Sequence, residues 1–510
     1  MAEPAGGIPE VPDRLDGLLA RSAAAHPGRR AVVGGGLTVD YGTLDARVTA
    51  AAAALRGCTE PGDVVAVASV LHPDFAVAYY AAARAGLTAA VVNPLLREED
   101  LLHVLTLGGA RVAFVDAALG ERLERVRDRL PALREVVVYG AEGRLSAYGT
   151  EGPVPDPGTG PQDTAVLQFT SGTTGRPKAV RLTHRNVTVN AAQVAGAHLL
   201  DGGSVTLNHL PTYHPMHLNS AVAAGAVQVL CPAPDPYTAL TTAAREGATI
   251  LYSLPVRLSR LAAHPELESV AVPALRHVAS GGSGLPATAA RTLSRRLGVP
   301  VFQGYGLAET SPLTHCDDPA DPVPGSVGRP VAGTRCRVVD VDTRAVLPSG
   351  TAGEVQLRGP QVMRGYAGGP DGTGLEPDGW LSTGDVGRIA EDGRLFLVDR
   401  LGDVFKCDNF LVAPSDVERV LLDHPLVADA VVVEVPDAAH GAVAGALVVL
   451  AKGAADGAAT LASVVSAAND RLPYYQHVRD AITVDAIPRS GNGKIQRRLL
   501  APQLTERQPA

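Results

Sequence analysis

Short valine-rich runs alternate with Ala/Leu/Arg stretches over the first 300 residues, and this alternation restricts the fold more than any other feature. The runs Val64–Ser69, Thr88–Asn93, Val112–Val115 and Glu135–Tyr139 have the length and β-branched content of buried strands. Strands that alternate with helices predict stacked α/β layers. Because 510 residues exceed what one compact core holds, we expect an α/β multidomain protein.

The pattern changes twice in the second half of the chain. From Val323 to Leu397, short strands and glycine turns dominate, which predicts a small β-barrel subdomain. Beyond Arg400 we expect a compact α+β unit of about 100 residues. Its predicted elements are a helix at Pro414–Asp423, strands at Asp429–Val435 and Val443–Leu450, and a helix at Thr460–Leu472. We therefore predict two domains, residues 1–399 and 400–510.

Composition excludes several classes of protein. The 45 basic and 53 acidic residues give a net charge of −8, which argues against a nucleic-acid partner. The five cysteines are scattered without a Cys-x-x-Cys pair, so a zinc site and a disulfide framework are disfavoured. The first residues lack a signal-peptide pattern, and the apolar stretch Phe75–Leu96 contains Arg84. We expect a cytoplasmic protein without a membrane span.

Residues 169–178, Phe-Thr-Ser-Gly-Thr-Thr-Gly-Arg-Pro-Lys, carry the strongest chemical signal. A strand ends there in hydroxyls and glycines, and a lysine follows. Glycines let backbone N–H groups approach an anion, hydroxyls add donors and the lysine adds charge, so the segment suits a polyphosphate. The expected phosphate-binding residues are Thr170, Ser171, Gly172, Thr173, Thr174 and Lys178. Pro177 before the lysine departs from the Walker pattern.

This string resembles the phosphate-binding loop of the adenylate-forming superfamily, which includes acyl-CoA synthetases, peptide-synthetase adenylation domains and firefly luciferase. The similarity extends from about residue 12 to about residue 500, with further motifs in the expected order, and is strongest to acyl- or aryl-CoA ligases. Ala179 replaces the glycine that usually follows the lysine. The resemblance implies ATP and Mg²⁺ as cofactors, a small carboxylic acid as substrate, an adenylation core at residues 1–399 and a mobile lid at 400–510.

The resemblance also implies roles for residues in four further motifs. In Gly304–Thr310, Tyr305 stacks on adenine, Thr310 contacts the α-phosphate, and Glu309 helps to hold Mg²⁺. The remaining implied residues are Thr170 for Mg²⁺, Gly282, Gly304 and Gly306 for the nucleotide, Ser280 and Gly281 for the acyl pocket, Asp385 for both ribose hydroxyls, and Arg400 for ribose or phosphate. Lys494, in a Gly-rich loop near the C-terminus, would bridge the acid and the α-phosphate and stabilise the transition state.

The acid pocket is expected around Pro211–His217, where His214 occupies the position of a histidine beside the substrate carboxylate in acyl-CoA synthetases. His214 and His217 have metal-like spacing, but no third ligand is visible, which favours ordinary pocket histidines. No Asp lies in Tyr213–Ala223 to pair with an α-ammonium, so an α-amino acid is disfavoured. Small residues at Ser220–Gly225 are expected to leave room for an aryl, cinnamoyl-like or medium-chain acid.

The acceptor of the activated group stays open. Gly402 stands where the family has an Asp or Lys hinge, and Asn409 replaces a glycine that lets the pantetheine arm pass. CoA is the first expectation. The alternatives are a carrier-protein thiol, or a small nucleophile such as an amine or the nitrite used by family-like diazotising ligases. A nucleotide-binding scaffold without activity is a further class, which the joint presence of Glu309, Asp385 and Lys494 disfavours.

Overall fold

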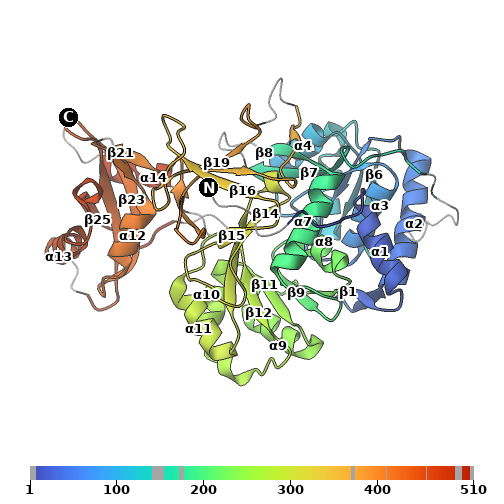
Figure 1. Cartoon of the computed structure of the whole chain (residues 1–510), viewed down its shortest axis with the longest axis horizontal. Helices are drawn as coiled ribbons and strands as arrows, with labels where there is room; N and C mark the ends of the chain where they lie inside the picture. Colours follow the sequence, from blue (N-terminus) through green and yellow to red (C-terminus); the bar gives the residue numbers. More distant parts are fainter. Residues whose placement is uncertain are drawn as a thin grey trace. The chain divides into compact units, whose positions relative to one another are not determined.

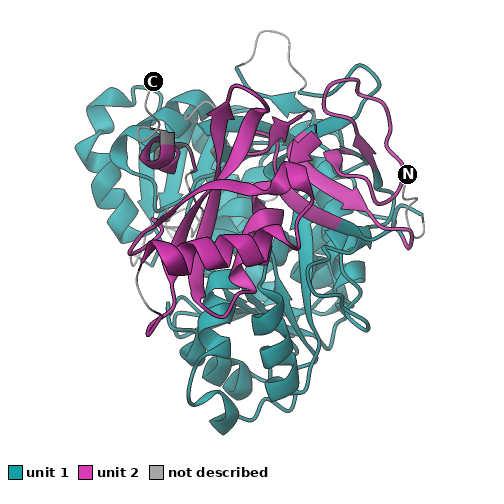
Figure 2. Ribbon diagram, turned by 90° about the vertical axis from the view of Figure 1, so that its left-hand side faces the viewer, with its two compact units in different colours: residues 1–336, 357–382, 393–395 teal, residues 337–356, 383–392, 396–510 magenta. Residues whose placement is uncertain are grey.

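The computed structural model describes residues 7–140, 154, 156–171, 177–368, 374–408, 410–454, 457–488, 495 and 497–505. The chain divides into two compact units, drawn in different colours in Figure 2. The first comprises residues 1–336, 357–382 and 393–395, and the second comprises residues 337–356, 383–392 and 396–510. The predicted boundary between residues 399 and 400 falls inside the second unit and stays a prediction.

Two large sheets form the framework of the first unit (Figure 1). The nine-stranded sheet has the order β15-β14-β13-β12-β11-β9-β10-β1-β2, and the seven-stranded sheet has the order β18-β8-β7-β4-β3-β5-β6. The first contains β1 Arg30–Gly34, β2 Leu37–Asp40, β9 Val205–His209, β10 Val227–Leu230, β11 Ile250–Ser253, β12 His277–Ser280, β13 Val301–Gly306, β14 Leu313–Cys316 and β15 Arg329–Pro330. The second contains β3 Val64–Val67, β4 Thr88–Val91, β5 Ala110–Val115, β6 Glu135–Val138, β7 Thr164–Ser171, β8 Pro177–Thr183 and β18 Gly365–Tyr366.

The central strands of both sheets run parallel, and several are buried along their whole length. Every residue of β4, β10 and β11 is buried. Helices cover both faces of a parallel sheet, which explains why these strands are mostly apolar and do not alternate between apolar and polar residues. The expected α/β architecture is confirmed.

Helices connect these strands, and local signals fix several of their ends. The helices are α1 Asp16–Ala25, α2 Tyr41–Cys58, α3 Asp74–Arg84, α4 Glu98–Gly108, α5 Ala117–Arg125, α7 His184–Ala197, α8 Pro215–Ala223, α9 Pro236–Glu246, α10 Pro255–Ala262 and α11 Ala287–Leu297. Asp40 caps α2 by accepting from the Thr43 N–H at 2.7 Å. Thr183 and Asn186 form a reciprocal capping box at the start of α7.

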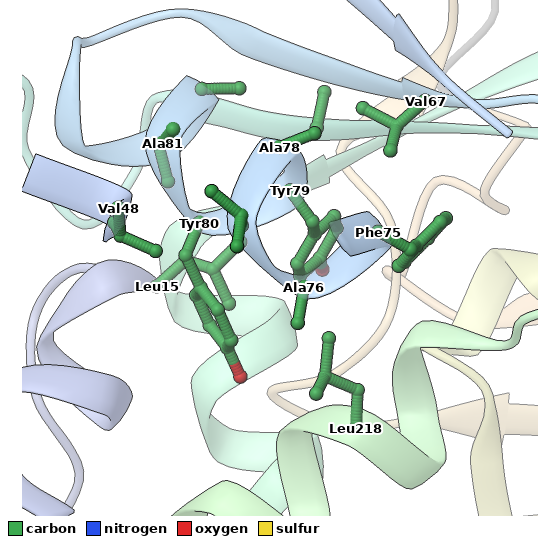
Figure 3. Packing of buried hydrophobic residues seen from close by; sticks show 14 of the residues in the cluster. Leu15, Val48, Val67, Phe75, Ala76, Ala78, Tyr79, Tyr80, Ala81 and Leu218 are labelled. Carbon is green, nitrogen blue, oxygen red and sulfur yellow. The ribbon is translucent and has the colours of Figure 1, made fainter. Parts of the chain in front are cut away.

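Helix α3 lies in the largest hydrophobic core, and all its residues from Phe75 to Ala83 are buried (Figure 3). The buried Tyr80 hydroxyl donates to Asn219 Oδ1 at 2.9 Å, and Asn219 Nδ2 donates to the Tyr79 hydroxyl at 3.1 Å. One amide on α8 therefore serves two tyrosine hydroxyls on α3. No helix among the described residues combines the length and apolar character that a bilayer crossing requires.

The prediction of a β-barrel is wrong, because the sheet does not close. Residues around the predicted subdomain form a four-stranded sheet with the order β16-β17-β19-β20, and no sheet closes on itself within the described part of the chain. Its strands are β16 Arg335–Val339, β17 Gly353–Arg358, β19 Leu381–Ile389 and β20 Leu395–Arg400. Closed barrels need more strands, with a matching tilt and stagger, so four strands leave an open sheet.

The rest of the second unit matches the α+β pattern expected from the sequence. Its sheet has the order β22-β21-β24-β23, with β25 paired in parallel to β24. The elements are β21 Phe405–Cys407, β22 Phe410–Val412, α12 Pro414–Leu422, β23 Val427–Asp437, β24 Gly441–Leu450, α13 Ala458–Asn469, β25 Val478–Thr483, α14 Arg497–Leu500 and α15 Pro502–Thr505. Arg497 Nη2 contacts both oxygens of the buried Glu418 carboxylate at 2.8 Å, which ties α14 to α12.

We predict that Asn219→Leu lowers the free energy of unfolding by about 2–4 kcal/mol, because two buried hydroxyls lose their partner. Removing both hydroxyls as well, in the triple variant Tyr79→Phe/Tyr80→Phe/Asn219→Leu, should restore most of that loss, since apolar replacement of both partners is nearly neutral. Urea unfolding measures both variants. A triple variant no more stable than the single one contradicts this role of Asn219.

Buried histidines of the first unit predict acid sensitivity. Burial lowers the pKa of His184 and His209 to about 4 and that of His198 and His315 to about 3. Between pH 6.5 and 4 the unfolded chain binds these protons and the native chain does not, so stability rises with pH in that window. Each histidine contributes about 1.4 kcal/mol per pH unit. The loss of stability begins as the pH falls below about 6.5 and is absent above it.

Urea midpoints measured from pH 7.5 to 5 check this dependence. His184 Nδ1 accepts the Leu15 N–H at 3.1 Å, and the side-chain oxygen in His184→Asn can replace that acceptor without titrating. This variant should reduce the pH dependence by about one proton. Stability that stays flat from pH 6.5 to 5, or a slope unchanged in His184→Asn, contradicts the prediction.

Candidate active site

The hydroxyl- and glycine-rich segment joins two adjacent antiparallel strands. β7 pairs with β8 so that Thr170 lies opposite Lys178 and Ser171 opposite Pro177. Thr170 is half-buried and Lys178 is exposed. The sequence therefore brings a hydroxyl and an ammonium group to the same end of one strand pair, which suits binding of an anion there. Gly172, Thr173 and Thr174 and the side chain of Ser171 lie outside the described residues.

Glu309 and Tyr366 complete this end of the strand pair. Tyr366 is on β18, which pairs with β8, and Lys178 Nζ lies 5.1 Å from the centre of its ring. The Tyr366 hydroxyl donates to Glu309 Oε1 at 2.8 Å, and burial raises the pKa of Tyr366. Glu309 belongs to the short helix η3 (Ala308–Thr310), which packs on β7 and β8. Thr170, Lys178 and Glu309, named from separate motifs, are thus neighbours within the first unit.

The acidic group here suits a hard divalent cation. Glu309 is half-buried, and among the described residues no hydrogen bond reaches its second oxygen, Oε2. A carboxylate with one oxygen oriented by a tyrosine and the other available, on a helix that packs against the strand carrying Thr170, offers the oxygen ligands that Mg²⁺ prefers. These residues fit Mg²⁺, which would neutralise phosphate charge when bound.

The motif at residues 304–310 links β13 to η3. Gly306 allows a close backbone approach, because a Cβ there would lie 1.9 Å from the Pro312 carbonyl oxygen. Thr310 is fully buried, and its hydroxyl bonds to backbone groups of Leu307 and Pro312. In this conformation Thr310 therefore stabilises the turn, and its expected contact with the α-phosphate stays a prediction.

A cavity of about 250 Å³ lies between α8 and the carboxyl ends of β11, β12 and β13. Its lining residues come from the sequence motifs and from elements outside them. They are His198, Leu210, His214, Met216, His217, Tyr252, Ser253, Leu254, Ala279, Ser280, Gly281, Gly282, Gly304, Tyr305, Gly306, Leu307, Ala308, Pro312 and Leu313. Five of the predicted site residues meet here in addition to His214 and Tyr305, namely Ser280, Gly281, Gly282, Gly304 and Gly306.

Four aromatic or imidazole rings succeed one another along one wall of this cavity. Ring centres of His214 and His217 are 6.2 Å apart, those of His217 and Tyr252 are 4.1 Å apart, and those of Tyr252 and His198 are 5.5 Å apart. Burial lowers the pKa of His214 to about 4 and that of His217 well below its usual value, so both are neutral at pH 7. Neither belongs to a possible metal-binding group among the described residues, where Cys407, Asp408 and His440 of the second unit form the one such group.

The small residues Ser220–Gly225 were expected to leave room for the acid. They are not among the described residues that line the cavity. Only the first turn of α8 faces it, because the following residues anchor the helix to the core. Ser22 donates to the Val222 carbonyl, and Leu218 lies in the hydrophobic cluster.

Sequence reasoning also missed Tyr366, His198 and Tyr252. No local motif marks these residues. They reach the site through strand pairing or from the end of α7, and only the tertiary fold reveals that.

Asp385 and Arg400 lie together in the second unit. Arg400 Nε is 2.8 Å from Asp385 Oδ1, and the Asp385 side chain is 8% exposed while that of Arg400 is 52% exposed. A buried carboxylate oriented by a partly exposed guanidinium can accept ribose hydroxyls, so the pair fits its expected role. Gly402 follows in the turn before β21. Lys494 and Asn409 lie outside the described residues.

Comparisons with known proteins agree with these motifs. Residues 19–367 match the AMP-binding enzyme family and residues 416–494 match the AMP-binding enzyme C-terminal domain. 4-coumarate–CoA ligase 2 of Oryza sativa subsp. japonica is 33% identical over 89% of this chain and 85% of the relative. Feruloyl-CoA synthase of Amycolatopsis sp is 33% identical over 93% and 96%.

Among solved structures, ATP-bound MatB from Rhodopseudomonas palustris superposes with a TM-score of 0.85 at 28% identity, covering 96% of this chain and 99% of that one. The two family matches together cover most of the chain, in the order that the motifs predict. The chain therefore belongs to the AMP-binding enzyme family and is an AMP-forming, acid–CoA ligase-like enzyme.

Proposed function

We propose that this enzyme uses ATP and Mg²⁺ to convert a small aryl or arylacrylic acid into its acyl-AMP and then transfers the acyl group to the thiol of CoA. One observation carries the proposal. Thr170, Lys178 and Glu309 gather at the end of β7 and β8, and the neighbouring residues Leu307 and Ala308 line a largely apolar cavity. A phosphate site thus adjoins a pocket suited to an organic acid.

The first half-reaction needs positioning and charge stabilisation rather than a general base. A carboxylate oxygen of the acid attacks the α-phosphorus of ATP, and the bond to pyrophosphate breaks as pyrophosphate leaves. Because the nucleophile is already an anion, no proton has to be removed. The exposed Lys178 ammonium is proposed to stabilise the polyphosphate, and Lys494 is proposed to reach the α-phosphate.

His214 is proposed to orient the reacting carboxyl group. Its Nδ1 accepts the Met216 N–H at 3.3 Å at the start of α8, so in the neutral ring the proton resides on Nε2. Since burial keeps its pKa near 4, His214 offers an uncharged N–H donor over the whole physiological range. Such a donor can bind a carboxylate oxygen without forming an ion pair that would weaken its nucleophilicity.

CoA is proposed as the acceptor because the chain is similar to CoA ligases. One departure from the family sequence weighs against CoA. Asn409 stands where the family has a glycine, in the segment expected to admit the pantetheine arm. The preceding Asp408 has a left-handed backbone with φ of 49° and pairs with His440 Nδ1 at 2.9 Å. A carrier-protein thiol, an amine or nitrite is therefore the alternative acceptor.

Replacing Lys494 by Ala should abolish ATP–pyrophosphate exchange, and replacing Lys178 by Ala should slow it by about 10²–10³, as expected for loss of one charged transition-state contact. Lys452→Ala is the matched control, because Lys452 is exposed and lies outside every motif. All three variants should keep the wild-type melting temperature. Normal exchange in Lys494→Ala would refute its assignment.

AMP release should depend on CoA when ATP and a suitable aryl acid are present. Coupled AMP assays with CoA, a phosphopantetheinylated carrier protein, an amine or nitrite separate the acceptors. If AMP release is independent of CoA but requires the carrier protein, the amine or nitrite, then that compound and not CoA is the acceptor. The variant Asn409→Gly tests whether Asn409 narrows the passage for the CoA thiol. If it does, the variant should have a higher kcat with CoA than the wild type. A lower kcat would contradict that effect.

A further inference from the structure

We propose that Cys407, Asp408 and His440 of the second unit bind one zinc ion through a thiolate, a carboxylate and an imidazole. These residues are different from those expected to bind Mg²⁺ with ATP, and the proposal does not depend on the reaction that the enzyme catalyses. The spacing along the chain does not announce the site, because Cys407 and Asp408 lie at one turn and His440 lies at another.

The three side chains bring one ligand atom each to the same place. Cys407 Sγ, a carboxylate oxygen of Asp408 and a ring nitrogen of His440 all lie within 4.8 Å of one another. The two Asp408 oxygens lie 3.0 and 2.9 Å from His440 Nδ1. The ligands of a tetrahedral zinc ion are about 3.3–3.8 Å apart, because each lies about 2.0–2.3 Å from the metal. A shift of the side chains by about 1 Å therefore allows all three to bind one ion.

Backbone pairing holds the three residues together before any ion binds. Cys407 is on β21, opposite Gly441, the first residue of β24, and His440 precedes that glycine. The Asp408 N–H donates to the His440 carbonyl oxygen at 3.1 Å. The His440 N–H donates to Asp437 Oδ1 at 2.9 Å. Because the backbone of both turns is already fixed, binding of an ion orders few further groups, which favours affinity.

The surroundings of the thiol favour a cation that arrives from solvent. Cys407 is buried, whereas the side chains of Asp408 and His440 are 32% and 27% exposed, so an ion can reach them. Burial and the neighbouring Asp408 carboxylate raise the pKa of the Cys407 thiol. Arg479 opposes this effect, and Asp437 adds to it. A divalent cation would bring positive charge to a place where two carboxylates lie near a thiol.

The combination of ligands decides which metal fits. Zinc binds Cys, His and Asp side chains, and a site with three protein ligands leaves the fourth position to water. Mg²⁺ and Ca²⁺ prefer oxygen ligands, of which this group offers only the Asp408 carboxylate. Without a metal, the same contacts amount to a hydrogen-bonded Asp–His pair beside a cysteine of the core, and a binding measurement separates the two explanations.

Isothermal titration calorimetry of the full chain with Zn²⁺ tests the site. The protein is prepared without a histidine tag, stripped of metal, and kept reduced with a phosphine in the absence of ATP. We expect one ion per chain with a Kd of about 10 µM or tighter, and no saturable binding of Mg²⁺ in its place. Titration with Co²⁺ gives a second reading, since a tetrahedral site with a thiolate ligand shows a thiolate-to-cobalt charge-transfer band and strong visible absorption.

Variants of each ligand show whether the ion binds at this place. Cys407→Ser, Asp408→Asn and His440→Gln should each weaken Zn²⁺ binding by at least about tenfold, because even loss of a residue that only orients a metal ligand costs about 10–100-fold. Asparagine suits the left-handed backbone of residue 408, where φ is 49°, so Asp408→Asn removes the charge without strain. Cys58→Ser is the matched control, since Cys58 is an exposed cysteine of the first unit, and it should bind Zn²⁺ as the wild type does.

The outcomes are distinct. A Kd weaker than about 10 µM overturns the site. Zn²⁺ binding that is unchanged in any folded ligand variant, or lost in Cys58→Ser, also overturns it, because the ion would then bind elsewhere. A charge-transfer band that disappears in Cys407→Ser and persists in Cys58→Ser supports it. Melting temperatures without metal show which variants fold, and if Cys407→Ser does not, Asp408→Asn and His440→Gln decide the result.

Discussion

The amide of Asn219 is the contact on which the acid pocket depends. It joins the hydroxyls of Tyr79 and Tyr80 on α3 inside the largest hydrophobic core and so fixes α8 against that helix. The first turn of α8 presents His214, Met216 and His217 to the cavity. Because buried polar groups cost free energy unless they are paired, this link specifies one position of α8 rather than a range of packings. The side chains at the N-terminus of α8 are therefore held in defined positions.

The charged side chains of the site and the surface proposed to bind the acid lie in different places. The charged groups, Lys178 and Glu309, gather at the end of β7 and β8, half-buried or exposed, where a hydrated polyphosphate can reach them. The described residues that line the cavity beside them are uncharged, and burial keeps its histidines neutral. This division suits a reaction whose nucleophile is an anion before it binds. The protein has to orient that anion and stabilise the phosphates, and it needs no group to remove a proton.

The sequence predicted elements whose signals are local. The valine-rich strands, the strand that leads into the hydroxyl- and glycine-rich segment and the α+β unit after Arg400 follow from composition over a few residues, and each is present. The barrel was wrong because short strands and glycine turns show that strands exist but not whether a sheet closes. Tyr366 could not be predicted beside Glu309, since only the pairing of β18 with β8 brings them together. The spacing of His214 and His217 is metal-like, but the sequence favoured ordinary pocket histidines, and the fold places both on a cavity wall.

The central claim is that the acid's own oxygen attacks the α-phosphorus of ATP. The most direct measurement follows ¹⁸O from a labelled carboxylic acid through a complete turnover with the wild-type enzyme, by mass spectrometry of the nucleotide product. The account predicts that AMP gains one ¹⁸O atom from the acid and that pyrophosphate carries none. AMP without the label, or the label in inorganic phosphate with ADP as the nucleotide product, would contradict it.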